Sequence, residues 1–457
     1  MSNELLIALM WIAVVVLLLS LGSHIGFVLG MIAVVAGLIG WGGTSFFYMF
    51  PIRIFALLEN YVMVAVPLFV FMGFLLERSG LGEDLFGGVE YILGGFRGGM
   101  AITVIVVTTL VAACTGIVAT GVIMAGVLAL PSMLRRGYNK GLALGSVAAG
   151  GTLGILIPPS VNLVIYAALS ATSVGKLFLG AFPSGFLLSG IYITYTALVA
   201  NLRPKMAPKR GEVPEIKLEG MPEAVLDIDK AIAEAKYPRL RMFRGILPVV
   251  FIITLVMGSI IGGIATPTEA AAFGAASALA VTAMYRRLSL NTLKQAMMSS
   301  VQTVGTIAGV LVGAMCFSAI FMGLGGKDIV FDLLMGTNFP PSVLIWVIVV
   351  VIVFMGCFLD ALAIMLILLP VVLPIQSAMG WHPIWFALIF NVTMQTAWLT
   401  PPLGFALVFL RGLQMPGVTF GDIVRGCAPF IGLQLIGVAI LIQFPIIITY
   451  FPDLLIK

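Results

Sequence analysis

Charge is what this 457-residue sequence most lacks. Only 9% of its residues are Asp, Glu, Lys or Arg, whereas a soluble protein carries roughly a quarter. Apolar residues make up 61% of the chain. Apolar runs of about twenty residues, the length that crosses a hydrocarbon core, recur from Leu5 almost to the C-terminus. The composition excludes a soluble globular domain and predicts an all-α integral membrane protein with about ten crossings.

Histidines and clustered metal ligands are also scarce. The chain has two histidines, and its four cysteines are spread through apolar stretches. Buried thiols are therefore a better interpretation than disulfides, and haem or zinc would lack its usual ligands. No phosphate-binding loop or Ser-His-Asp pattern occurs either. These absences exclude an ATP-driven pump and a membrane hydrolase, so we expect no enzyme activity and no cofactor.

Lys and Arg are missing from the first 52 positions and concentrate later at the ends of apolar runs. The first run follows Glu4 without the basic segment of a cleaved signal peptide, so we expect a retained helix. The positive-inside rule places the later Lys and Arg in cytoplasmic loops. The net charge of +5 is therefore no sign of a nucleic-acid partner.

One long polar stretch, residues 201–244, interrupts the apolar pattern, with ten Lys or Arg against seven Asp or Glu. We expect it to be a cytoplasmic linker between two membrane halves. This predicts the following division: scaffold helices at 1–78, a first repeat at 79–190, scaffold helices at 245–322, a second repeat at 323–433 and a C-terminal helix at 434–457.

The two halves share glycines and prolines at a constant offset of 243 positions. Such residues fix backbone geometry, so their coincidence indicates duplicated structure rather than shared hydrophobicity. The matches are Gly80-Leu81-Gly82 with Gly323-Leu324-Gly325, Pro131 with Pro374, Gly137 with Gly380, and Pro158-Pro159 with Pro401-Pro402.

The two copies are predicted to have opposite orientations. The turn at 134–140 contains Arg135, Arg136 and Lys140, whereas its counterpart at 377–383 has neither Lys nor Arg. The positive-inside rule places the first turn in the cytoplasm and the second in the periplasm, as an inverted-topology repeat requires.

Within each copy, two apolar segments flank a short glycine-containing or polar tip, at 112–116 and at 355–360. We interpret each as a re-entrant helical hairpin whose tip lies inside the membrane. Non-helical backbone at that depth survives only where it is buried in protein or lines a cavity, so the tips indicate a site. Two ordinary crossings joined by short loops are the alternative; the inverted charge at the hairpin bases favours re-entry.

A helix interrupted by two prolines follows each hairpin, at 150–160 and at 395–404. Because proline lacks the N–H that bonds the carbonyl four residues earlier, the carbonyls of Gly154, Ile155, Ala397 and Trp398 are expected to be free. Free carbonyls suit a desolvated sodium ion, and the N-terminus of the next half-helix suits an anion. A purely structural kink is the alternative, made less attractive by the symmetric placement of the two pairs.

Several polar residues near these breaks have both a structural and a functional interpretation. Asp360 is expected to cap the helix that begins at Ala361, or to bind an ion or couple a proton. Local bonding of threonine hydroxyls to backbone, and helix packing of Gln395 and Asn162, are the structural alternatives to a ligand role. The hydroxyl candidates are Thr115, Thr152, Thr396 and Thr400. Thr266, Pro267 and Glu269 are interpreted as a helix start with a capping box.

These motifs together make the chain similar to the large membrane subunit of tripartite ATP-independent periplasmic (TRAP) transporters. The similarity covers essentially the whole chain and is carried by residues 154–160, 265–272, 358–361 and 399–404. It implies an elevator-type fold, sodium-coupled uptake of an organic acid and a location in the bacterial inner membrane. It also implies two partners, a small four-helix membrane subunit and a periplasmic substrate-binding protein.

Carried onto this sequence, the resemblance implies two sodium sites at the hairpin tips and broken helices, with substrate between them. The implied sodium ligands are Thr115, Gly116, Gly154, Ile155, Leu156, Pro159, Leu359, Asp360, Ala397, Trp398 and Thr400. The implied substrate ligands are Cys114, Thr152, Ser160, Asn162, Phe358, Gln395 and Thr396.

Two segments depart from the family pattern. The first tip, 113–116, contains no serine, which makes Thr115 the preferred hydroxyl ligand. The run 391–398 differs from the dicarboxylate and sialic-acid branches and looks closer to branches associated with keto acids or other monocarboxylates. Two other functions stay open: a stand-alone sodium-dicarboxylate or citrate symporter, and a non-transporting membrane scaffold or channel subunit.

Overall fold

The computed structural model covers the chain and describes residues 3–21, 24–41, 43–116, 118–209, 212, 238–336, 339–402 and 404–456. Within these residues every regular element is a helix, as the composition predicted. Most of the predicted linker, residues 210–211 and 213–237, lies outside the described residues. Seven of the described helices are long and apolar enough to span a membrane, fewer than the ten crossings expected, because several apolar runs form helices of only 10–17 residues.

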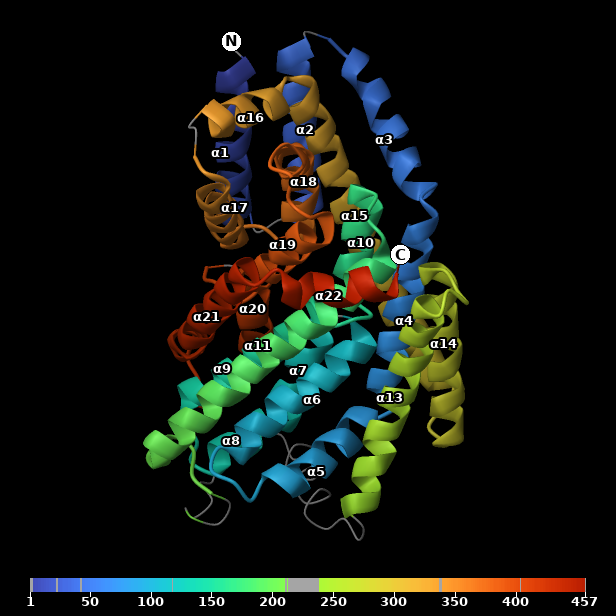
Figure 1. Cartoon of the computed structure of the whole chain (residues 1–457), viewed down its shortest axis with the longest axis vertical. Coiled ribbons are helices and arrows are strands. Elements are labelled where there is room, and N and C mark those ends of the chain that lie inside the picture. The colour runs from blue at the N-terminus through green and yellow to red at the C-terminus, as the bar shows by residue number, and fades with distance from the viewer. Residues whose placement is uncertain are drawn as a thin grey trace.

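The N-terminal third begins with two helices, α1 (Asn3–Leu21) and α2 (Ile25–Trp41), followed by α3 (Met49–Leu58) and α4 (Ala65–Arg78). Helix α2 packs along α15 (Leu290–Gly323), and close approach depends on glycine: a Cβ on Gly26 or Gly313 would overlap the backbone of the other helix. Helices α13 (Pro238–Ile261) and α14 (Pro267–Met284) pack against each other, and α14 against α4. Figure 1 shows α3 and α4 as one long path down the side of the molecule.

The predicted helices after the linker all form, and local capping sets where they start. Thr266 and Glu269 make the expected capping box at the start of α14. Helix α15 begins at Leu290 because Ser289 accepts a hydrogen bond from the Thr292 N–H at 3.0 Å and caps it there.

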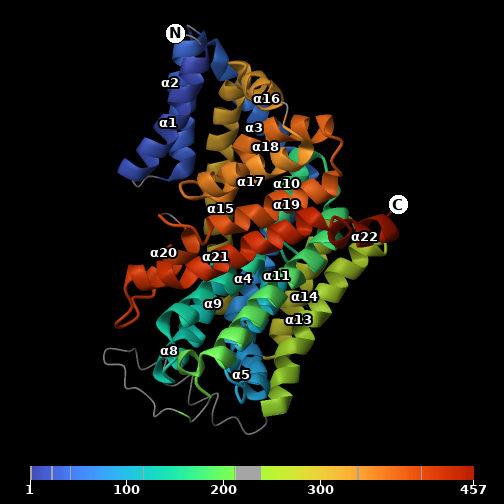
Figure 2. The same cartoon turned by 60° about the vertical axis from the view of Figure 1, so that its left-hand side comes forward.

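The first repeat contains α5 (Leu81–Leu93), α6 (Gly99–Thr115), α7 (Val118–Leu128), α8 (Leu130–Arg135), α9 (Lys140–Thr152), α10 (Val161–Ser170) and α11 (Val174–Leu202). The second contains α16 (Gly326–Gly336), α17 (Pro341–Gly356), α18 (Ala361–Ala378), α19 (Pro383–Ala397), α20 (Phe405–Gly412) and α21 (Phe420–Gln443), and α22 (Ile446–Leu455) ends the chain. Figure 2 shows α16–α18 in the upper part of the molecule and α5 and α8 in the lower part.

The helix bounds obey the same offset of 243 residues. Helix α18 (361–378) corresponds residue for residue to α7 and α8 together (118–135), and both α9 and α19 start at matched positions, 140 and 383. Gly137 and Gly380 both have a positive φ, 75° and 65°, and both proline pairs are joined by a cis peptide bond. The internal repeat is therefore structural.

One matched pair of glycines is not equivalent in space. Gly80, with φ 68°, precedes α5, but the positive-φ glycine before α16 is Gly325, at 81°, and not Gly323. The turn has moved by two residues because α15 continues through Gly323 before it ends. The division of the chain into scaffold and mobile parts stays a prediction.

Candidate functional site

At both predicted hairpin tips the chain turns from one helix into the next. At the first, the Met100 N–H donates to the Tyr138 hydroxyl at 3.3 Å and Arg136 Nη1 lies 3.5 Å from Met100 Sδ, so the two ends of 100–138 meet. At the second, α17 packs against α18, and Figure 1 shows both in the same upper part of the molecule. The first arms, α6 and α17, have 17 and 16 residues, about 25 Å of helix, which is short of a hydrocarbon core of about 30 Å.

The tip of hairpin one is a glycine turn pressed against the first proline pair. Gly116 has φ 60°, and a Cβ there would lie 2.6 Å from the Pro159 carbonyl oxygen. Only glycine fits both the backbone conformation and the space. Beside it, the Thr115 side chain is 2% exposed and its Oγ1 has no hydrogen-bond partner. A buried hydroxyl without a partner is rare in proteins and is suited to a ligand that the protein binds.

The tip of hairpin two is built around the start of α18. Asp360 is the N-cap residue, and its Oδ2 accepts a hydrogen bond from the Leu362 N–H at 3.3 Å, which confirms the capping interpretation. Within the same tip, Gly356 packs so closely on Ala397 that a Cβ would overlap it. Each tip therefore contacts the broken helix of its own repeat.

Both predicted helix breaks are present: α9 ends in a short 3-10 turn (Leu153–Ile155) before α10, and α19 ends four residues before the second proline pair. Two of the four carbonyls expected to be free are not. The Ile155 carbonyl accepts from Ser160 Oγ, and the Trp398 carbonyl accepts from the Ala406 N–H at 3.1 Å. The prolines do remove the usual donor, but the chain folds back after each pair and supplies another.

The threonine hydroxyls at the second break bond locally, as their structural interpretation predicted. Thr396 Oγ1 donates to the Thr393 carbonyl at 2.5 Å and Thr400 Oγ1 to the Thr396 carbonyl at 2.7 Å. At the first break, Thr152 Oγ1 donates to the Ala149 carbonyl at 2.8 Å. A hydroxyl that donates still has lone pairs, so local bonding leaves a coordinating role open.

The two repeats meet at a contact between equivalent residues. Gln395 Nε2 donates to Thr152 Oγ1 at 3.1 Å, and both side chains are fully buried. The two positions differ by 243, the offset that relates the repeats. In a pair of repeats related by a two-fold rotation, a residue can contact its own counterpart only near the rotation axis. Thr152 and Gln395 therefore mark the axis, and the centre, of the predicted inverted repeat.

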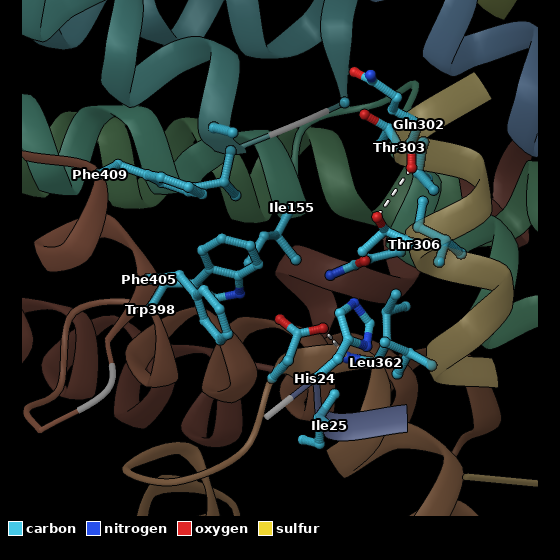
Figure 3. A pocket seen from close by; sticks show the side chains of 18 residues that line it. His24, Ile25, Ile155, Gln302, Thr303, Thr306, Leu362, Trp398, Phe405 and Phe409 are labelled. Atoms are coloured by element: carbon cyan, nitrogen blue, oxygen red, sulfur yellow. Dashed lines mark hydrogen bonds between the residues drawn. The ribbon is translucent and has the colours of Figure 1, made fainter. Parts of the chain in front are cut away.

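A cavity of about 410 Å³ lies beside this centre. Five predicted ligands line it: Gly116 and Asp360 from the tips, Ile155 and Trp398 from the broken helices, and Asn162 from α10. Figure 3 shows the aromatic side chains of Trp398, Phe405 and Phe409 on one side of the cavity and Gln302, Thr303, Thr306 and His24 on the other. The volume is in the range of small-molecule sites.

The other predicted ligands do not line this cavity. Cys114 points to α13, with its Sγ 3.9 Å from the Val249 carbonyl oxygen, and Phe358 and Leu359 line a second, apolar cavity next to α1. The rest are buried or half-buried in the walls behind the tips: Thr115, Thr152, Gly154, Leu156, Pro159, Ser160, Gln395, Thr396, Ala397 and Thr400. Their roles as ligands stay predictions. Within the described residues, no group of three or more His, Cys, Asp or Glu side chains is placed to hold a metal ion.

Sequence reasoning missed the residues that complete the cavity. His24 precedes α2, and Gln302, Thr303 and Thr306 lie on α15, outside the repeats on which the interpretation concentrated. A signal was present: Gln302 and Thr306 are spaced by one helical turn within an otherwise apolar run, which places both on one face. In the structure Thr306 Oγ1 donates to the Gln302 carbonyl at 2.9 Å.

Comparison with known proteins places this architecture among transporters. Residues 12–447 match the family model of the tripartite ATP-independent periplasmic transporter, DctM component. The chain is 30% identical over 402 residues to the C4-dicarboxylate TRAP transporter large permease protein DctM of Pseudomonas aeruginosa, covering 88% of this chain and 87% of that protein. It is 28% identical to the sialic acid TRAP transporter large permease protein SiaM of Vibrio cholerae, covering 87% of each.

A solved structure shares the fold. The crystal structure of the Alcanivorax borkumensis YdaH transporter, described as having an unusual topology, superposes with a TM-score of 0.62 at 18% identity. The match covers 87% of this chain and 88% of that one. At this level of identity the likeness is one of fold alone.

Proposed function

Because the chain belongs to the DctM family of large membrane subunits of tripartite ATP-independent periplasmic transporters, we propose that it takes up an organic acid across the bacterial inner membrane in symport with sodium. As a member of that family it is a multi-pass inner-membrane transport subunit and not an enzyme. The sodium coupling, the carboxylate substrate and the partners are the proposed part.

The observation that supports the proposal most is the convergence of both repeats on one cavity. Two tips and two broken helices reach it from opposite halves of the chain, and the start of α18, capped by Asp360, lies in its wall. Such an arrangement offers oxygen ligands to a cation and N–H donors to a carboxylate in one place. The curated relatives named above carry C4-dicarboxylates and sialic acid, which are carboxylates.

The first sodium site is proposed at hairpin one, with Thr115 Oγ1 as its hydroxyl ligand. Thr115 is the candidate because its oxygen is buried and lacks a partner. The second is proposed at hairpin two, with Thr400 and the carbonyl of Ala397. Each sodium that enters down a 100 mV potential releases about 2.3 kcal/mol, and a monocarboxylate that enters with it consumes the same amount. Two sodium ions per acid therefore leave about 2.3 kcal/mol, which concentrates the acid about fiftyfold before the sodium gradient is counted.

We also propose the two partners of the family: a small four-helix membrane subunit and a periplasmic protein that delivers the substrate. The keto acid or other monocarboxylate indicated by residues 391–398 is the proposed substrate class. A stand-alone sodium-dicarboxylate or citrate symporter predicts uptake by this chain alone. A non-transporting scaffold subunit predicts no sodium-dependent accumulation under any condition.

The test is uptake into proteoliposomes at varied sodium concentration, with and without the two partners. Thr115→Ala and Thr400→Ala are expected to raise the sodium concentration for half-maximal uptake severalfold, because each removes one ligand. Thr103→Ala is the matched control, since Thr103 Oγ1 is also buried without a partner but lies on α6 three turns from the tip. Sodium dependence that is unchanged in both tip variants would remove these threonines from the sites.

A further inference from the structure

The cavity has two unlike walls. One is aromatic: the Trp398 ring lies 5.3 Å from the Phe405 ring and 6.4 Å from the Phe409 ring, measured between centroids. The other is polar and is formed by His24, by Asn162 and by the α15 residues Gln302, Thr303 and Thr306. Figure 3 shows these two groups of side chains on opposite sides of the open space.

The charged groups of the cavity are few. His24 is the one lining residue, among those the structure describes, whose side chain can carry a positive charge, and no Lys or Arg lines the wall. Asp360 is the one lining carboxylate, and it lies close enough to His24 for an electrostatic interaction. The side chains of His24, Asn162 and Gln302 offer donors at one end, beside the Asp360 carboxylate, and the indole N–H of Trp398 is the donor of the aromatic wall.

A ligand with carboxylates at both ends fits this arrangement poorly. One carboxylate would face His24 and the polar α15 residues, but the other would lose its water against the aromatic wall, where the indole N–H of Trp398 is the one donor among the three rings. Burying a carboxylate there with a single N–H donor costs more than the contacts with the rings return, because its remaining lone pairs stay unpaired. An aromatic ring in the same place would stack on the wall at the centroid distances that aromatic pairs prefer.

On the basis of the proposed function, we infer that the substrate is an amphipathic monocarboxylate whose body is aromatic or similarly broad and apolar, with its carboxylate toward His24 and its body against Trp398, Phe405 and Phe409. This assigns His24 as the specificity-determining residue at the polar end and Phe409 at the apolar end. It narrows the substrate beyond a carboxylate in general.

The test measures binding to the purified full-length chain in sodium-containing buffer, by equilibrium dialysis with labelled phenylpyruvate and with labelled succinate as probes. The dissociation constant is expected to be at least about tenfold lower for phenylpyruvate than for succinate. Phe409→Ala is expected to weaken phenylpyruvate binding at least about tenfold and succinate binding less than about twofold, because only the former loses a stacking partner.

Two further variants keep the result interpretable. Phe409→Leu retains an apolar wall and is expected to give an intermediate loss, even if the alanine variant unfolds. His24→Ala is expected to weaken phenylpyruvate binding, since it removes the donor at the carboxylate end. Phe451→Ala, at an exposed ring on α22 away from the cavity, is expected to leave both dissociation constants unchanged.

Succinate binding as tight as that of phenylpyruvate, or an equal effect of Phe409→Ala on both acids, would overturn the inference. The binding measurement also distinguishes a failure of this inference from a failure of the proposed function. If phenylpyruvate is preferred but sodium drives no uptake, the proposed function fails and the cavity assignment stands. If sodium drives uptake of succinate and phenylpyruvate neither binds nor competes, the inference fails and the proposed function stands.

Discussion

Replacing Thr152 by valine and Gln395 by methionine, singly and together, tests whether the two repeats are joined at the axis. Gln395 Nε2 donates to Thr152 Oγ1 at 3.1 Å, and neither side chain is exposed. Thr152→Val also removes the donation to the Ala149 carbonyl, so it is expected to destabilise the protein by about 1–3 kcal/mol. Gln395→Met removes one bond and is expected to cost about 1 kcal/mol, while its Oε1 is already without a partner.

The informative quantity is the coupling energy between the two substitutions, because it isolates their interaction from the local bond to Ala149. A buried side-chain hydrogen bond between membrane helices is expected to give about 0.5–1.7 kcal/mol. The assay is reversible unfolding in mixed micelles, followed by circular dichroism. Thr152→Val combined with Thr103→Val, which lies on α6 with no shared partner, serves as the additive control. Additive free energies for Thr152 and Gln395 would refute the axial contact.

Three further outcomes are expected. Gly116→Ala places a Cβ on a residue with φ 60° and close to the Pro159 carbonyl, which is expected to cost at least about 1–2 kcal/mol. We expect a large loss of uptake in proteoliposomes and a smaller decrease of the unfolding temperature. A variant with normal uptake would contradict the tip geometry. Glu90 is 2% exposed and pairs with Arg136 at 2.6 Å. Arg136→Ala leaves this carboxylate as an uncompensated buried charge, which is expected to lower the free energy of unfolding by about 3–5 kcal/mol in the same assay. The double variant Arg136→Met, Glu90→Leu removes both charges and is expected to recover most of that stability. The Lys209 N–H, followed by Arg97, lowers the pKa of Glu212, so the contact with Arg97 is present above the ordinary glutamate pKa and is lost only as pH falls through the lowered value. The titration of the Glu212 carboxyl, followed by carbon-13 NMR, is expected to have its midpoint below the ordinary glutamate value and to move up in Arg97→Met. A midpoint at or above the ordinary value would contradict this.

The repeat, the helix breaks and the helix start at Thr266 were predictable because each rests on residues that restrict the backbone. Gly137 and Gly380 take the positive φ that only glycine adopts easily, and the two matched proline pairs, 158–159 and 401–402, interrupt their helices. Asp360 was predictable as a cap for the same local reason. These features depend on short segments, so the sequence contains the information directly.

The cavity wall was harder to predict because it depends on which helices pack together. His24 and Thr306 are far from the repeats in the chain, and they reach the site only because α2 and α15 pack against each other beside it. The bonding of the Ile155 and Trp398 carbonyls was mispredicted for a related reason. Counting the donors that proline removes does not reveal the donors that the refolded chain supplies from Ser160 and Ala406.

The central claim is that two hairpins enter the membrane from opposite sides and return to the side from which they came. It is tested most directly by labelling single cysteines, in a variant without native cysteines, with a membrane-impermeant maleimide applied from either side of the membrane. Phe96→Cys and Lys140→Cys flank hairpin one, and Ser342→Cys and Ser377→Cys flank hairpin two; all four positions are exposed. The account predicts that 96 and 140 react only from the cytoplasmic side and 342 and 377 only from the periplasmic side. Labelling of the two members of either pair from opposite sides would contradict it.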